Sequence, residues 1–166
     1  MKKYIITITI ALVAMFSASA QEKSGSRVLP CGTNVMDVTL GLGDFTDILV
    51  PPVGGSYERV LFDYGQSLSF GVAGYGHFEA HRSAGTPIYG GSIQLAGLAH
   101  LSITENLEVY AGPSIGYIKV SGGWLSRSGT SFGAILGARY FFKDRMGANV
   151  HFGGITFVSV GVSFKL

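Results

Sequence analysis

The chain has 166 residues, of which 25 are glycine and 13% are charged, whereas soluble domains carry about 25% charged residues and about 7% glycine. Its 47% hydrophobic residues exclude a disordered chain, and glycines without a three-residue period exclude collagen. The length allows about one domain.

The N-terminus predicts a cleaved secretory signal over residues 1–20. Two lysines precede an apolar core over 4–16, and small residues at 18–20 match a signal-peptidase site. That core is shorter than the about 20 residues that a membrane-spanning helix needs. Removal of Lys2 and Lys3 leaves ten of the twelve basic residues against ten acidic ones, so the mature net charge is zero. No basic stripe therefore argues for a nucleic-acid partner.

Residues 21–34 predict a flexible periplasmic segment that precedes a folded unit over 35–166. Cys31 is the single cysteine, which excludes an intrachain disulfide. Lipidation of Cys31 is the alternative to a free thiol, but Pro30 before it and the distance from the apolar core argue against it. We expect a free thiol in a mobile segment.

From residue 35 onward apolar and small or polar residues alternate with a period of two, which is typical of strands. The last stretch shows it best, with apolar residues at 158, 160, 162, 164 and 166. Residues 146–164 carry no Asp, Glu, Lys or Arg and imitate a membrane helix, but their glycines and valines favour two strands. The predicted strands are 35–43, 54–62, 67–80, 88–103, 107–120, 130–142, 146–154 and 156–166.

This pattern predicts an all-β fold, a transmembrane antiparallel up-and-down barrel of about eight strands, because about 9–11 tilted residues cross a bilayer. Short polar turns at 63–66, 104–106 and 143–145 alternate with longer stretches at 44–53, 81–87 and 121–129. A periplasmic N-terminus places the longer stretches outside the cell. The alternative is a soluble antiparallel barrel or sandwich, which normally carries charges on its outer face.

Three segments carry a family resemblance. VGVSFKL at 160–166 resembles the C-terminal strand signal of outer-membrane barrels, although Leu166 stands where an aromatic residue is usual. VGGSYER at 53–59 and LSFGVAGY at 68–75 resemble the second and third strands of small outer-membrane barrels of the outer-membrane protein X-like and surface-antigen groups. The residues of the insertion signal are Val160, Val162, Phe164 and Leu166.

The resemblance implies a place in the outer membrane of a Gram-negative-type cell, among outer-membrane lipid and lipopolysaccharide. It also implies insertion by the barrel-assembly machinery, which reads the C-terminal signal. The group includes adhesins and structural proteins, so it specifies architecture better than activity.

Strand parity turns several charged side chains toward the lumen, in the periplasmic half. They are Asp37, Glu58, His100, Glu108, Arg139 and Lys165. Because an unpaired buried charge is expensive, opposite charges in a narrow lumen should pair. We expect a structural ionic network that holds the barrel shut; a gated, narrow pore is the alternative.

The longer stretches are where we expect contacts with an unknown extracellular partner, in a structural or adhesin-like role. Candidate contact residues are Asp44, Asp47, Trp124 and Arg127, since a Trp beside an Arg has the composition of an interaction anchor.

Two histidine patterns raise other functions. His100 and Ser102 form the H-x-S pair that lipid A deacylases carry, which suits acyl transfer. Parity turns both inward near the periplasmic end, away from lipid A. His77, Glu79 and His81 share one strand face, where metal ligation is conceivable, but polar residues leaving the membrane explain them as well. We therefore expect no catalytic, metal or cofactor site.

Overall fold

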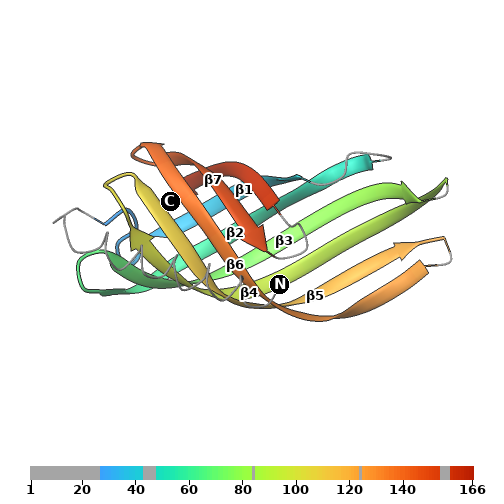
Figure 1. The fold of residues 1–166 in the computed structure, drawn as a ribbon, viewed down its shortest axis with the longest axis horizontal. Coiled ribbons are helices and arrows are strands. Elements are labelled where there is room, and N and C mark those ends of the chain that lie inside the picture. The colour runs from blue at the N-terminus through green and yellow to red at the C-terminus, as the bar shows by residue number, and fades with distance from the viewer. Residues whose placement is uncertain (1–26, 43–47, 84, 124, 154–157) are drawn as a thin grey trace, which may run out of the picture.

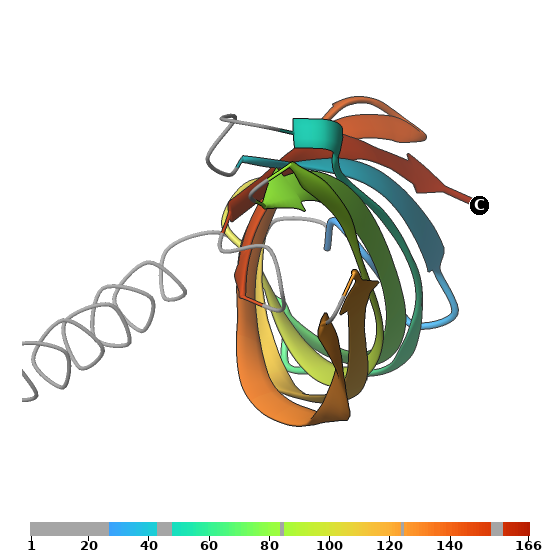
Figure 2. The same cartoon turned by 90° about the vertical axis from the view of Figure 1, so that its right-hand side faces the viewer.

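The computed structural model describes residues 27–42, 48–83, 85–123, 125–153 and 158–166, and every structural statement below concerns these ranges. Eight antiparallel strands follow one another around a closed barrel, and β1 pairs with β8 to complete the ring (Figures 1 and 2). The strands are β1 (Asn34–Leu42), β2 (Ile48–Tyr64), β3 (Leu68–Ser83), β4 (Thr86–Ser102), β5 (Leu107–Gly122), β6 (Leu125–Lys143), β7 (Met146–Gly153) and β8 (Val158–Lys165). The predicted fold class is confirmed. In the described ranges no helix has the length and apolar character to cross a membrane.

Period-two alternation divides each strand between an outer and an inner face. In β4, Ile93 and Leu95 are 69% and 68% exposed on the outside, while Ser92 and Gln94, which alternate with them, are buried inside. Exposed apolar side chains continue around the barrel, up to Phe132 at 78%. So large an apolar surface suits lipid rather than water.

The two ends of the barrel differ. The terminal end holds Asn34, Leu166 and the turns at 65–67, 103–106 and 144–145. At the opposite, distal end, β2 to β6 form long hairpins, because these strands have 16 to 19 residues and a bilayer needs about 9–11 (Figure 1). Part of each long strand therefore extends beyond a membrane of ordinary thickness.

These hairpins correct the predicted long connections at 44–53, 81–87 and 121–129. Most of those residues are strand, and Arg127 pairs with Val120 inside the β5–β6 ladder instead of lying in a loop. Prolines 51 and 52 looked like a loop, but register shifts in β2 accommodate them. Residues 126–130 are Ser- and Gly-rich and exposed, so no apolar face marked them as strand.

Residues 27–33, here called the N-terminal strap, pack into the terminal end instead of hanging free. Val28 and Leu29 are buried with Val35, Val60 and Phe141 in one apolar cluster. The strap is also bonded to the strands: the Val28 N–H donates to Ser102 Oγ at 3.0 Å. Part of the segment predicted to be flexible thus has defined contacts with the barrel, and the flexibility of 21–34 stays a prediction. Residues 21–26 and the predicted signal at 1–20 lie outside the described residues.

Contacts with the barrel hold the strap at its first residue and near its last. Arg27 forms an ion pair with Asp63, with 3.1 Å between Nη1 and Oδ2, and donates to the Gly65 carbonyl. The Gly32 N–H donates to the Val60 carbonyl at 2.9 Å. Cys31 is an exposed free cysteine whose N–H donates to Asp63 Oδ1. These contacts attach the strap to β2 and to the 65–67 turn at the terminal end of the barrel.

Candidate functional site

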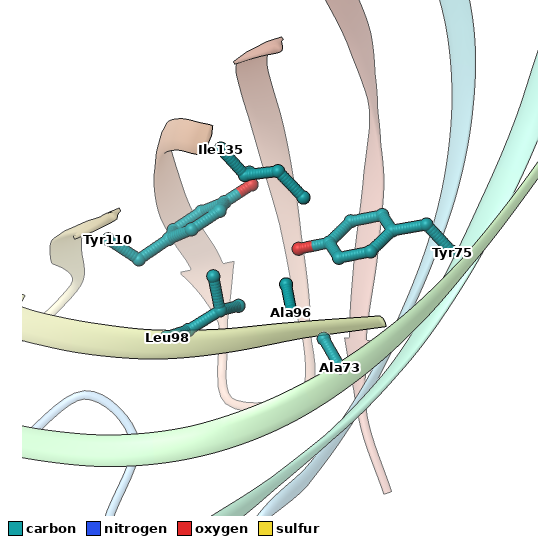
Figure 3. Close-up of a cluster of buried hydrophobic side chains, with 6 residues drawn as sticks. All are labelled: Ala73, Tyr75, Ala96, Leu98, Tyr110 and Ile135. Carbon is teal, nitrogen blue, oxygen red and sulfur yellow. The ribbon is translucent and has the colours of Figure 1, made fainter. Parts of the chain in front are cut away.

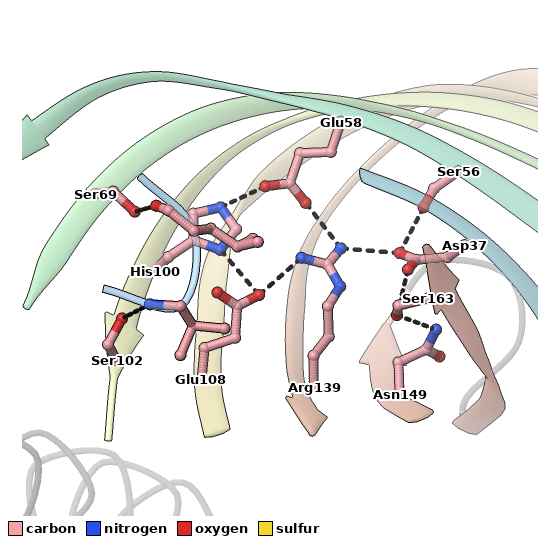
Figure 4. A network of polar contacts seen from close by, with 12 residues as sticks. Asp37, Ser56, Glu58, Ser69, His100, Ser102, Glu108, Arg139, Asn149 and Ser163 are labelled. Atoms are coloured by element: carbon pink, nitrogen blue, oxygen red, sulfur yellow. Dashed lines mark hydrogen bonds and ion pairs between the residues drawn. The ribbon is translucent and has the colours of Figure 1, made fainter. Parts of the chain in front are cut away.

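Arg139 lies at the centre of the lumen, on β6, and meets three carboxylates from other strands (Figure 4). Its Nη2 lies 2.8 Å from Asp37 Oδ2 and 2.8 Å from Glu58 Oε2, and its Nη1 lies 2.9 Å from Glu108 Oε1. All four side chains are at most 2% exposed. A guanidinium suits this place because its planar array of donors can satisfy several carboxylates at once.

His100 connects two of these carboxylates from β4. Its Nε2 lies 2.7 Å from Glu58 Oε1, and its Nδ1 lies 3.6 Å from Glu108 Oε1. We call Asp37, Glu58, His100, Glu108 and Arg139 the ionic network. It joins β1, β2, β4, β5 and β6 across the lumen.

Hydroxyl and amide groups extend the network to the remaining side of the barrel. Ser56 Oγ donates to Asp37 Oδ2 at 2.8 Å, and Ser163 Oγ donates to Asp37 Oδ1 at 2.6 Å. Asn149 Nδ2 donates to Ser163 Oγ at 2.9 Å. Asp37 is thus tied to β2, β6 and β8, and β7 is tied in through Ser163.

Lys165 is the member of the predicted network that forms no close ion pair among the described residues. Its Nζ lies 3.9 Å from the centroid of the Phe141 ring, in a cation–π contact at the terminal end. Lys165 is the last residue of β8, and Ser163 takes the inward position next to Asp37. An inward-facing position alone does not predict a contact with the network, because the position of the residue along the strand also decides which side chains meet.

On the distal side of the ionic network, two tyrosines fill the middle of the lumen. Their hydroxyls face one another across it, above an apolar cluster (Figure 3). Arg139 Cζ lies 4.4 Å from the centroid of the Tyr110 ring. Gly137 leaves room for that ring, since a Cβ there would collide with it. The members of the cluster are Ala73, Tyr75, Ala96, Leu98, Tyr110 and Ile135.

We call Tyr75, His77, Ser92, Gln94, Tyr110 and His151 the tyrosine–histidine layer. Each has a buried side-chain nitrogen or oxygen without a hydrogen-bond partner among the described residues. The rings of His77 and His151 come from β3 and β7 and have centroids 6.1 Å apart, and the Tyr75 and His151 rings are 6.0 Å apart. Sequence reasoning missed His151, because no spacing relates it to His77.

The structure gives the two histidine patterns neighbours that the sequence did not suggest. The described residues hold no cluster of three or more His, Cys, Asp or Glu side chains placed for a metal ion, so His77, Glu79 and His81 do not gather into one. His100 faces carboxylates, and the Ser102 hydroxyl accepts from Val28 in the strap. Each member of the H-x-S pair is thus engaged elsewhere.

The structure describes only some of the residues that the sequence analysis proposed for partner contact and for the insertion signal. Asp44, Asp47 and Trp124 lie outside the described residues, and Arg127 is exposed on the β5–β6 hairpin. In the C-terminal strand, Val160 and Val162 are each 39% exposed on the outer face, and Leu166 is 65% exposed. Phe164 is half-buried between them. Their role as an insertion signal stays a prediction.

Solved structures with the same architecture are outer-membrane and designed transmembrane barrels. The N-terminal β-barrel domain of Pseudomonas aeruginosa OprF has a TM-score of 0.55 at 14% identity, over 83% of this chain and 100% of that one. The outer membrane protein OprG from Pseudomonas aeruginosa has a TM-score of 0.52 at 10% identity, over 87% and 99%. A de novo designed transmembrane β-barrel has 0.51 at 14%, over 83% and 98%.

The fold is that of a small outer-membrane β-barrel. The outer-membrane location predicted from the sequence agrees with this fold. No protein family and no curated protein matches the sequence.

Proposed function

We propose that this protein is a closed outer-membrane barrel that acts as a scaffold or in surface interaction, through hairpins that project from the cell. The observation that carries the proposal is the ionic network, which crosses the lumen between strands on opposite sides of the barrel. The strap adds a second closure at the terminal end, with Leu29 fully buried. An ion on its way through would have to displace both.

The proposed orientation places the terminal end in the periplasm and the distal hairpins outside. Outer-membrane barrels have short periplasmic turns, and the described turns of the terminal end are short. The β5–β6 hairpin carries a run of exposed Ser, Arg, Gly and Thr residues at 126–130, which is polar enough for contact with a partner in water. Lipid A modification is less well supported, because His100 and Ser102 have other partners.

Conductance across a planar bilayer tests the closed lumen against the pore alternative. The purified protein is expected to insert without steady single-channel openings, because an ion would have to break the contacts of Arg139 with three carboxylates. A folded barrel is verified beforehand by its altered gel mobility when unboiled. Steady openings of the folded protein would overturn the proposal in favour of a pore.

A further inference from the structure

A groove of about 690 Å³ crosses the outer, lipid-facing surface from β2 to β6. One wall is a row of outward side chains that pair from strand to strand: Tyr57 with Gly74, Gly74 with Leu95, Leu95 with Ile115, and Ile115 with Phe132. Three of these, Leu95, Ile115 and Phe132, are 48% to 78% exposed and stand out from the sheet. The wall is therefore tall and apolar.

The floor is the next outward row toward the terminal end. It runs through Arg59, Val72, Gly97 and Pro113, and the same row continues on β6 with Ala134, which pairs with Pro113. Gly97 has no side chain, and pairing of β4 with β5 is interrupted beside Gly97 and Pro113, between Ala96–Ser114 and Ala99–Ala111. Pro113 has no N–H to offer to β4. Because Gly97 has no side chain, and a Cβ there would meet nothing within 4 Å, the groove has open space at this point.

Arg59 closes the β2 end of this row and has an incomplete set of partners. It is exposed on the outer face, and its contact there is Nη1 to Asn34 Oδ1 at 3.3 Å. Arg59 forms no ion pair within the part of the chain that the structure describes. A cation on the lipid face without a carboxylate is complementary to an anion from outside the protein.

The groove runs from the terminal end toward the middle of the barrel, as a lipid chain does when it extends from its head group into the membrane. Arg59 lies five positions from Tyr64 at the terminal end of β2, whereas Ala134 lies nine positions from Lys143 at the terminal end of β6. The floor therefore climbs away from the terminal end as it passes from β2 to β6, as expected for tilted strands. An anionic head at Arg59 and an apolar chain along Val72, Gly97 and Pro113 fit this slope.

We propose that the groove binds one acyl chain of an anionic glycerophospholipid of the periplasmic leaflet, with its phosphate paired to Arg59. The choice of leaflet rests on the orientation in the proposed function. The groove and the arginine do not depend on a closed lumen, so this proposal and that one fail separately.

Native mass spectrometry of the barrel tests the proposal. The protein is released from detergent micelles that contain equal amounts of dioleoyl phosphatidylglycerol and dioleoyl phosphatidylcholine. The wild type is expected to keep one phosphatidylglycerol in about fivefold excess over phosphatidylcholine, as one arginine near a membrane surface favours anionic lipid by about 1 kcal/mol. Equal retention of the two lipids by the wild type would overturn it, and this comparison needs no variant.

Two variants with matched controls locate the site. Arg59→Gln is expected to reduce phosphatidylglycerol to the level of phosphatidylcholine, whereas Lys119→Gln, an outward charge on β5, leaves the preference intact. Gly97→Leu fills the groove and is expected to reduce both lipids. Gly76→Leu, on the outer face of β3 beyond the groove, is expected to change neither. A Cβ meets nothing within 4 Å at either glycine, so both variants fit the backbone.

Two further results would count against the lipid. Undiminished phosphatidylglycerol on folded Arg59→Gln would show that the arginine holds no head group. Barrel dimers that Gly97→Leu abolishes would show that a second copy of the chain occupies the groove.

Discussion

The ionic network and the tyrosine–histidine layer are neighbours in one lumen, yet they satisfy their polar atoms differently. In the network, Arg139 meets Asp37, Glu58 and Glu108 at 2.8 to 2.9 Å, and all are buried. In the layer, the hydroxyls of Tyr75 and Tyr110 have no partner among the described residues. The network is thus held by ion pairs within the protein, although Arg139 Nε and Glu108 Oε2 also lack a hydrogen-bond partner among the described residues. No ion pair joins members of the layer in those ranges.

Charge explains this difference. A buried ion without a counter-ion costs several kcal/mol, so charged groups in a narrow lumen must find one another. A neutral hydroxyl, amide or imidazole is satisfied by a bound water, which buried polar sites commonly hold. The charged contacts that stabilise the lumen therefore lie on its terminal side, and we expect bound water to satisfy the neutral polar groups on its distal side.

Arg139→Met tests this comparison with the largest expected effect. The variant leaves Asp37, Glu58 and Glu108 buried without their guanidinium, and we expect the free energy of unfolding to fall by about 3–5 kcal/mol. Urea unfolding in detergent, followed by the gel shift of the unboiled protein, measures it. Arg127→Met on the exposed hairpin is the control, with a change within about 0.5 kcal/mol. Equal losses in the two variants would contradict a special role for the network.

The members of the network were predictable because two local signals place them. Period-two parity gives the inward face, and strand direction gives the periplasmic half of the barrel. Asp37, Glu58, His100, Glu108 and Arg139 were therefore expected there, together with Lys165. The same signals failed for Lys165, whose level differs from that of the others and which lies against Phe141. His77 and His151 meet only because the barrel closes, and no local pattern reports that closure.

The strap and the distal hairpins show what lay beyond local patterns. Residues 27–33 have no strand period, and their contacts are remote in sequence, as between Val28 and Ser102. The hairpins contain Pro51, Pro52 and a Ser- and Gly-rich run at 126–130, which look like loops. Hydrogen bonding to a neighbouring strand overrides the loop preference of these residues. That pairing depends on the whole barrel and is therefore not visible in a local stretch of sequence.

Leu29→Ala tests how much the N-terminal strap contributes to stability on the terminal side of the lumen, next to the ionic network. Leu29 is fully buried, but it belongs to a short strap, so we expect a loss of about 2–3 kcal/mol in unfolding free energy, less than for Arg139→Met. The same urea titration measures it, with Pro30→Ala as the exposed neighbour that changes little. No loss in Leu29→Ala would mean that the strap adds nothing to the terminal side.

Tyr110→Phe is expected to have the smallest effect and is the most direct test of a hydrated layer. Arg139 lies over the ring rather than on the hydroxyl, at 4.4 Å from the centroid, so the variant keeps that contact. Because the hydroxyl has no hydrogen-bond partner among the described residues, its removal is expected to change the unfolding free energy by less than about 1 kcal/mol. Glu58→Gln, whose carboxylate contacts both Arg139 and His100, is the matched polar change inside the network and is expected to lose more. If Tyr110→Phe loses as much as Glu58→Gln, the layer is bonded as tightly as the network, and the division of the lumen into a closed side and a hydrated side is wrong.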